Sequence, residues 1–508
     1  MSEAQMEIAE YGWDEARGVF VHPESTPYVA GPRPLPQSLD HLEDREYTSN
    51  MTVEGRWPTV VRLTHTWQNV VDMDGRRYMF HYYRQALNVY DITDPTAREL
   101  ILEKRYAPEE GEFGAASIAY NEQLGAWLLI QCFEVPRTYG QDSNKYANPD
   151  TLARLMSVPG FRGFRVYELT GPTDWKLLAE VPTGPVDPVT GIHQGSGGVD
   201  TPAYDGGRYL YICAAPDDTF INQEFATYPY TPAQLIYDMS DPRRPQLVST
   251  WWVPGQRVDE IAAYRAWSRH GNRNSWMGAR VPTSVPVPLE RGGRYGYTAM
   301  GGLGLYVLDL ADPAHPTVAG SLELPQSWAG IEGDVVDTSR VTSRGVVLVN
   351  GGPMNEDGYE PYKEVYVIDV ADPTEPRIIA TLPRPLPPPD APYRDFVFRR
   401  GKFGPKRFGS NQHPGTPDPN LTLYSFGNAG VQMFDLTDLR EPRQAGYFVP
   451  RMTDELDNPR SYLVPTESIF VEWDRRLVWA FTTSGMYLLT SPLLGEPRPD
   501  ALSLGRPS

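Results

Sequence analysis

Hydrophobic and polar residues alternate along this chain in short runs that recur at intervals. The clearest copies are LYVLDLADPAHPTVAGSLELP at 305–325 and VYVIDVADPTEPRIIATLPRP at 365–385. In each copy two alternating runs flank an Asp-Pro pair, and a period of two predicts a half-buried strand. Asp and Pro favour a turn, because the Asp side chain accepts backbone hydrogen bonds and Pro fixes its own φ. Each copy is therefore predicted to be an antiparallel hairpin.

Further copies bring the total to seven and predict a repeat protein. They are LNVYDITDPTARELILEKRY at 87–106, FRVYELTGPTDWKLLAEVP at 164–182, LIYDMSDPRRPQLVSTWWVP at 235–254, VQMFDLTDLREPRQAGYFVP at 431–450 and the degenerate MYLLTSPLLGEP at 486–497. Two more strand-like runs precede each copy, so each unit has four strands, A to D. Seven such units predict an all-β, seven-bladed β-propeller over 45–495. We expect residues 1–44 to form an N-terminal extension packed on the propeller and 496–508 a C-terminal tail.

The seventh unit lacks a convincing strand D. The segment REYTSNMTVEGRWP at 45–58 resembles a strand D that has no strands A to C of its own. We therefore expect the N-terminal strand to complete the last blade and close the ring. Closure in this way removes a free strand edge that would invite aggregation.

The strand C consensus, LYVLDLADP at 305–313 and VYVIDVADP at 365–373, resembles that of the LVIVD-repeat proteins, a β-propeller family. The resemblance covers most of residues 45–495 and implies the propeller fold. It implies no particular chemistry, because propellers host enzymes, binding modules and scaffolds alike.

The long insertions fall in B–C and D–A connections, which emerge on the same face of a four-stranded antiparallel blade. We call this the insertion-rich face, and the face that carries the A–B and C–D turns the plain face. The longest insertions are 133–163, 256–276 and 384–414. Function usually lies on loops held by a rigid scaffold, and the many aromatic residues here suit a lid over an apolar or aromatic small molecule. We interpret the charges of RRGKFGPKR at 399–407 as solvated surface.

Four of the eight histidines are expected at or just before strand A of blades 1, 3, 4 and 6. They are His65, His193, His270 and His413. The corresponding regions of blades 5 and 7 carry Glu332 and Glu467. Strands A line the central channel, so these six side chains are predicted to converge on the propeller axis.

Converging imidazoles suit a divalent transition metal such as iron, zinc or manganese. Nearby carboxylates can bind the metal directly or orient the imidazoles. The carotenoid-cleavage oxygenases hold iron with four histidines and outer glutamates on a propeller axis. This chain is similar to them in that pattern alone and not in its repeat sequence.

The leading hypothesis is a metal-dependent enzyme (oxygenase, lyase or hydrolase) acting on a small aromatic or apolar metabolite. Arg269, Arg273 and Trp276 would position the substrate. One alternative is a metal-free acid–base lyase or isomerase using the same histidines and arginines. The other alternative is a propeller that binds a protein or ligand without catalysis.

The net charge of the chain and the motifs that it lacks limit the classes of partner and cofactor that we expect. The net charge of −19 would repel a nucleic acid backbone, and no P-loop or dinucleotide fingerprint indicates a nucleotide cofactor. We find no signal peptide or membrane span in the sequence and expect a cytoplasmic protein. The two cysteines, Cys132 and Cys213, are interpreted as buried packing residues. The sequence leaves the oligomeric state open, a homo-oligomer included.

Overall fold

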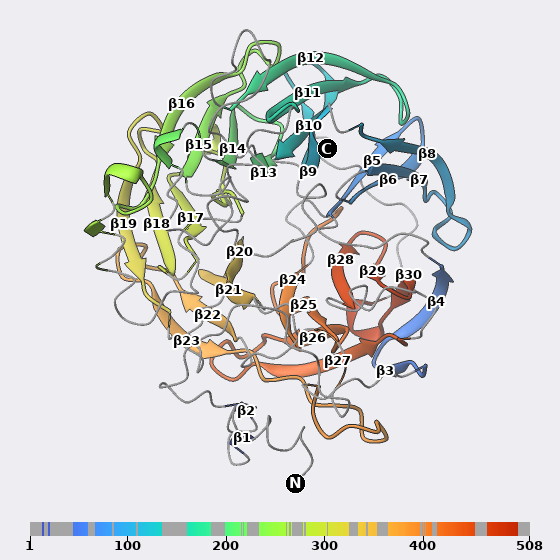
Figure 1. Ribbon diagram of the computed structural model, residues 1–508. Helices are drawn as coiled ribbons and strands as arrows, with labels where there is room; N and C mark the ends of the chain where they lie inside the picture. The colour runs from blue at the N-terminus through green and yellow to red at the C-terminus, as the bar shows by residue number, and fades with distance from the viewer. Residues whose placement is uncertain are drawn as a thin grey trace.

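A computed structural model describes most of the chain. The described residues are 13–14, 19–20, 44–58, 67–83, 86–107, 110–134, 160–183, 199–214, 216, 218–220, 233–260, 262–263, 266, 278, 281–301, 303–324, 334–341, 344–352, 364–396, 399, 401, 403–408, 414–452 and 465–495. They form a ring of seven antiparallel sheets around a central axis (Figure 1), as the repeats predicted. No helix within these ranges has the length and the apolar run that a membrane crossing requires.

Each sheet is one blade of the propeller, and strands A to D run outward from the axis. Blade 1 consists of β5 (Trp67–Met73), β6 (Arg76–Tyr83), β7 (Ala86–Asp91) and β8 (Glu99–Arg105). Blade 2 consists of β9 (Glu112–Asn121), β10 (Ala126–Glu134), β11 (Gly163–Leu169) and β12 (Trp175–Pro182). Blade 3 consists of β13 (Val199–Tyr204), β14 (Tyr209–Ala214), β15 (Ala233–Asp238) and β16 (Gln246–Trp251). Blade 4 has β17 (Tyr295–Ala299), β18 (Leu305–Asp309) and β19 (Thr317–Leu322).

Blades 5 to 7 complete the ring. Blade 5 consists of β20 (Asp334–Val341), β21 (Val346–Gly352), β22 (Val365–Asp369) and β23 (Arg377–Thr381). Blade 6 contains β24 (Phe403–Phe408), β25 (Leu421–Gly427), β26 (Val431–Asp435) and β27 (Arg443–Val449). Blade 7 consists of β28 (Thr466–Glu472), β29 (Leu477–Thr482), β30 (Gly485–Thr490) and β4 (Thr52–Trp57). Short 3-10 turns are η2 (Pro95–Ala97), η4 (Asp218–Phe220), η5 (Val258–Glu260), η6 (Leu289–Arg291) and η9 (Pro492–Leu494). Near the N-terminus, β1 (Trp13–Asp14) pairs with β2 (Val19–Phe20).

The Asp-rich C–D turns form as the sequence predicted. In blade 4, Asp309 accepts a hydrogen bond from the Ala311 amide at 3.0 Å, and Asp312 accepts one from Ala314 at 3.0 Å. Asp369 and Asp372 of blade 5 repeat both contacts. Each turn is thus two successive Asx turns, which is why the repeat carries a pair of aspartates three residues apart.

The N-terminal strand closes the ring, as predicted, and it does so across two blades. Strand β4 pairs with β30 and becomes strand D of blade 7. The preceding β3 (Tyr47–Ser49) pairs with β27, so the sheet of blade 6 has five strands. Asn50 links the two strands with a positive φ of 52° and donates a hydrogen bond to the Ala445 carbonyl at 2.7 Å. The second pairing was not anticipated from the sequence.

Blade 4 departs from the predicted four strands, because its inner strand is reduced to one bridge between Ser284 and Tyr297. The segment VPTSVPVP at 281–288 carries prolines at 282, 286 and 288, which cannot donate ladder hydrogen bonds. The buried amide of Gln234 in blade 3 substitutes for part of the ladder. It donates to the Val281 carbonyl at 3.2 Å and accepts from the Thr283 amide at 3.1 Å.

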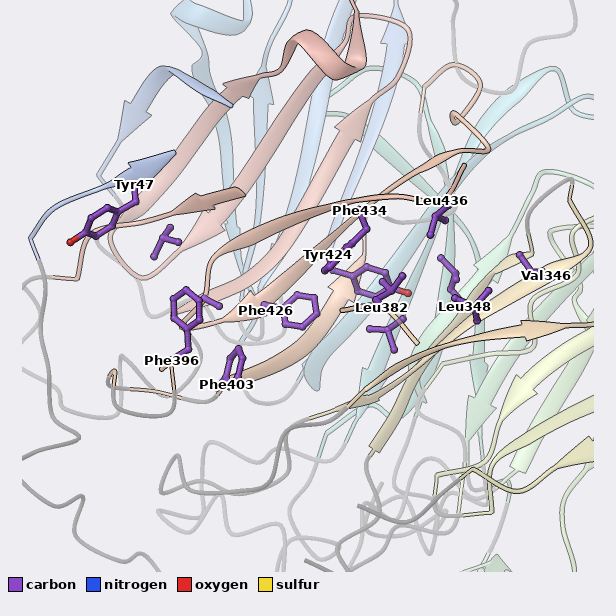
Figure 2. Packing of buried hydrophobic residues seen from close by; sticks show 14 of the residues in the cluster. Tyr47, Val346, Leu348, Leu382, Phe396, Phe403, Tyr424, Phe426, Phe434 and Leu436 are labelled. Carbon is purple, nitrogen blue, oxygen red and sulfur yellow. The ribbon is translucent and has the colours of Figure 1, made fainter. Parts of the chain in front are cut away.

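The hydrophobic core lies between the blades, and each blade packs both of its faces against its neighbours. Figure 2 shows the cluster between blades 5 and 6, which contains Tyr424 and Phe426 of blade 6 and Leu348 and Val346 of blade 5. Alternate residues of each strand therefore face opposite neighbours. This explains why strands B and C are buried on both sides and strand D is partly exposed.

Candidate axial site

Most of the long connections emerge on the insertion-rich face, in agreement with the sequence analysis. B–C or D–A connections span 135–162, 183–198, 215–232, 252–280 and 353–364. Most A–B turns are short, as between Met73 and Arg76 or between Glu472 and Leu477. The face at which strands A begin is therefore the face with the most loop material.

Of the predicted site residues, the structure describes one, Glu467. The others lie outside the described residues: His65, His193, His270, His413, Glu332, Arg269, Arg273 and Trp276. Their convergence on the axis is accordingly a prediction. In the described part of the chain, no group of three or more His, Cys, Asp or Glu side chains is arranged to hold a metal ion.

Glu467 is the second residue of β28, the inner strand of blade 7, and is 2% exposed. The pairing of β28 with β29 shifts register between Thr466 and Ser468, so Glu467 lies at a β-bulge. Its backbone carbonyl accepts a hydrogen bond from the Ser425 hydroxyl at 3.4 Å. Bulges often re-aim a side chain next to a functional site, and this one lies at the insertion-rich end of the strand.

Polar side chains join the inner strands of blades 7 and 1 beside Glu467. The Gln68 amide of β5 donates a hydrogen bond to the Ser468 hydroxyl at 3.0 Å. The Thr466 hydroxyl is buried and has no hydrogen-bond partner among the described residues. A buried hydroxyl of this kind is a candidate contact for a ligand or an ordered water.

Lys406 is a buried charge that the sequence analysis missed. It lies in β24, the inner strand of blade 6, and is 6% exposed. Arg399 is 1% exposed and donates hydrogen bonds to the carbonyls of Asn428 and Pro450. The interpretation of the charges of 399–407 as solvated surface was therefore wrong for Arg399 and Lys406. The aromatic residues at both ends of FGPKRF favour a strand there, but no local feature of the sequence marks its lysine as buried.

The sequence position of His413 relative to strand A was also misassigned. We expected the whole of 384–414 to precede strand A of blade 6, but β24 lies within that segment. His413 therefore follows strand A and belongs to the A–B connection. The next residue, Pro414, accepts a hydrogen bond from the Asp474 amide in the A–B turn of blade 7, on the plain face. This removes the reason for grouping His413 with the other three histidines.

His81 is unsuited to acid–base chemistry near neutrality. His81 is fully buried in β6, and burial, assisted by the charge of Arg98, lowers its pKa to about 3. Its ring contacts that of Phe481 with centroids 4.6 Å apart. His315 is exposed in a C–D turn and contacts Asp312 at 2.8 Å. Cys132 and Cys213 are buried, as the sequence analysis expected.

A second cluster of buried charges lies on the plain face, between blades 7 and 1. Arg77 contacts Asp72 at 2.7 Å, Glu472 at 2.7 Å and Asp474 at 2.8 Å. Burial alone would lower the pKa of Arg77, but its hydrogen bonds to Asp72 and Asp474 and the charge of Glu472 raise it. Arg475 contacts the same Glu472 at 2.7 Å. Each carboxylate has a guanidinium partner, so this cluster is a structural ion network.

Comparisons with solved structures return β-propellers of low sequence identity. The β-propeller domain of Cps50 (Swd1) from Myceliophteria thermophila is 12% identical with a TM-score of 0.41, and the match covers 84% of this chain and 99% of that one. A chain of the mitotic checkpoint complex is 8% identical with a TM-score of 0.42, covering 92% of this chain and 97% of that one. No protein-family model matches the chain. No curated protein matches it.

Proposed function

We propose that this propeller, a relative of the LVIVD-repeat proteins, is a metal-dependent enzyme that acts on a small aromatic or apolar metabolite at the insertion-rich end of its axis. His65, His193 and His270 hold the metal, and Glu332 and Glu467 bind it or orient the imidazoles. Arg269, Arg273 and Trp276 lie in the same insertion as His270 and position the substrate.

The observation that carries the proposal is where these residues stand relative to the inner strands. His65 precedes the first residue of β5 by two positions, Glu332 precedes that of β20 by two, and His193 precedes that of β13 by six. Glu467 lies in β28 itself. Strand A of every blade begins on the same face near the axis, which supports the expectation that residues at these positions of blades 1, 3, 5 and 7 converge. His270 stands fourteen residues before Ser284, in the longer connection that precedes strand A of blade 4, and the proposal requires this connection to bring it to the same point.

A bound metal would supply Lewis-acid activation of water, oxygen or a substrate oxygen. The side chains of the protein itself compensate charge, donate or accept hydrogen bonds and exclude water. The buried carboxylate of Glu467 compensates positive charge on the axis, and the Thr466 hydroxyl beside it offers a hydrogen bond to a polar group of the substrate. The aromatic residues of the insertions exclude water from the site.

Metal content of untagged protein, measured by mass spectrometry, tests the proposal. We expect near-stoichiometric iron, zinc or manganese in the wild type and loss of metal in His65→Ala/His193→Ala. His413→Ala is the matched control and keeps its metal, because His413 follows strand A. Absence of metal from the wild type after incubation with each of the three ions would refute the metal-dependent function.

Two alternatives predict other results. In a metal-free lyase or isomerase the same histidines and arginines exchange protons with the substrate, so no metal is bound and turnover depends on pH. In a non-catalytic scaffold, neither metal nor turnover is present, and the insertion-rich face binds a partner.

A further inference from the structure

The N-terminal strands β3 and β4 form a closing strap, residues 47–57, on the outer edges of blades 6 and 7 (Figure 1). Three of its side chains each enter a different cluster between blades. Tyr47 packs in the cluster between blades 5 and 6, Met51 in the cluster between blades 6 and 7, and Trp57 against the cluster between blades 7 and 1. The strap therefore contacts three consecutive blade interfaces and not only the blade that it completes.

The closing strap differs from the other outer strands in how it is attached. The outer strands of blades 1 to 6 each follow strand C of their own blade through a short turn, whereas β4 is joined to β30 by noncovalent contacts alone. Within the strap, only Tyr47 and Met51 are buried. Opening of the strap thus breaks two short ladders and exposes few apolar side chains, while strands A to C of every blade stay in place. Local opening of this kind needs less free energy than global unfolding.

The edge strands of blades 6 and 7 fit the backbone of the closing strap closely. Gly446 of β27 has no side chain, and a Cβ there would lie 2.7 Å from the carbonyl oxygen of Ser49. A Cβ at Gly485 of β30 would lie 2.6 Å from the carbonyl oxygen of Trp57. Release of the strap leaves both edges unpaired, and an unpaired edge accepts an extended chain by β-strand addition. The two edges therefore form a docking site for a segment with the backbone and the side chains of the strap.

We propose that this protein exchanges its closing strap with a second copy of itself, so that the strap of each chain completes blades 6 and 7 of the other. A second copy is the partner that fits, because its strap carries the same three anchors and restores the same contacts. The nine residues 58–66 join the strap to β5, so a released strap can extend about 30 Å from its own ring. At low protein concentration the strap closes its own ring, because its effective concentration there is higher. This inference does not depend on the proposed enzymatic function.

A disulfide between directly paired residues distinguishes the two arrangements. Thr52 of β4 and Thr490 of β30 are partners in the ladder. In full-length Thr52→Cys/Thr490→Cys, the bond forms within one chain when the strap closes its own ring and between two chains when straps are exchanged. The reduced protein is incubated at two concentrations, oxidised and separated by denaturing electrophoresis without reductant. A tenfold rise in concentration should raise the ratio of linked dimer to linked monomer about tenfold while the dimer is the minor species.

A substitution on the docking site tests whether the closing strap itself makes the dimer. Gly446→Ala places a methyl group against the Ser49 carbonyl, so in the two-cysteine protein it should reduce the linked dimer about tenfold or more. Ser321→Ala is the control, because Ser321 is exposed on the outer strand of blade 4, and it should leave the dimer unchanged. Hydrogen exchange on the wild type measures opening directly. Amides of the strap should exchange at least about tenfold faster than those of β29, because the strap opens without global unfolding.

Three results would each overturn the inference. The first is linked monomer alone at every concentration, and the second is linked dimer that persists in Gly446→Ala, which would place the contact on another surface. The third is equal exchange rates for the strap and β29, which would show that the strap does not open separately. If Gly446→Ala fails to fold, the concentration series and the hydrogen exchange of the wild type still decide.

Discussion

Two contacts between neighbouring blades use the same arginine interaction in different surroundings. Between blades 7 and 1, Arg475 donates to the carbonyls of Ile92 at 3.0 Å and Thr93 at 3.2 Å, which follow the first aspartate of a C–D turn. Between blades 5 and 6, Arg344 donates to the equivalent carbonyls of Leu436 at 2.5 Å and Thr437 at 3.1 Å. Both arginines come from an A–B turn on the plain face.

The difference lies in what surrounds the guanidinium. Arg344 is exposed, whereas the Arg475 side chain is 10% exposed and shares the fully buried Glu472 with Arg77. Trp479 donates a further hydrogen bond to Glu472 at 2.7 Å. Blades 7 and 1 come from opposite ends of the sequence, so their contact must offset a large loop-closure entropy. Of these two contacts, the one between the first and the last blade in the sequence carries the more extensive ion network.

The largest effect is expected at Glu472. Glu472→Gln leaves Arg77 and Arg475 buried without their shared charge partner, so the free energy of unfolding should fall by about 3–5 kcal/mol. Urea denaturation followed by tryptophan fluorescence measures it. Glu290→Gln is the control, because Glu290 accepts an exposed hydrogen bond from the Arg208 amide between blades 3 and 4 and should cost about 1 kcal/mol or less. Equal losses of unfolding free energy in the two variants would show that the buried network contributes no more than an exposed hydrogen bond.

A smaller and more direct test replaces the two equivalent arginines. Arg475→Met should reduce the free energy of unfolding by about 2–4 kcal/mol, because it removes one of the two guanidinium partners of the buried Glu472. Arg344→Met removes the same carbonyl contacts at an exposed site and should cost about 0.5–1.5 kcal/mol. The same denaturation experiment compares them. A larger loss from Arg344→Met would show that burial of the network does not set its contribution.

The smallest effect is a difference in acid sensitivity. Burial alone would raise the pKa of Glu472, but the charges of Arg475 and Arg77 and their hydrogen bonds lower it below its usual value. A carboxyl whose pKa is lowered on folding stabilises the fold above its unfolded pKa, about 4.3. That contribution is lost as the pH falls through the folded pKa. Between pH 5 and pH 3, wild-type protein should therefore lose more stability than Glu472→Gln, by at most about 1.4 kcal/mol per pH unit. Parallel pH profiles would contradict the assignment.

Local sequence was sufficient to predict the blades. The aspartate pairs, such as Asp309 and Asp312, specify the C–D turns through hydrogen bonds to nearby amides, and alternation specifies the strands on either side. The missing seventh strand D and the orphan strand at 45–58 predicted ring closure, which the β4–β30 pairing confirms. These features depend on contacts a few residues apart or on a simple count of strands.

The inner strands were harder to predict because their pairing is irregular. FGPKRF alternates poorly, so β24 was overlooked and His413 was placed before strand A instead of after it. The proline-rich 281–288 reduces strand A of blade 4 to one bridge. Lys406 is charged, and no local pattern distinguishes a charge buried at the axis from a charge in solvent.

The sequence by itself determined the number of blades, their turns and the strand that closes the ring, because short-range hydrogen bonds and a period of two encode them. The tertiary structure alone decided which charges are buried. Glu472 meets Arg77 across 395 residues of chain, and Lys406 is buried in the inner strand of blade 6. Such contacts depend on the register of neighbouring blades, which is set by packing over the whole ring and leaves no trace in any one repeat.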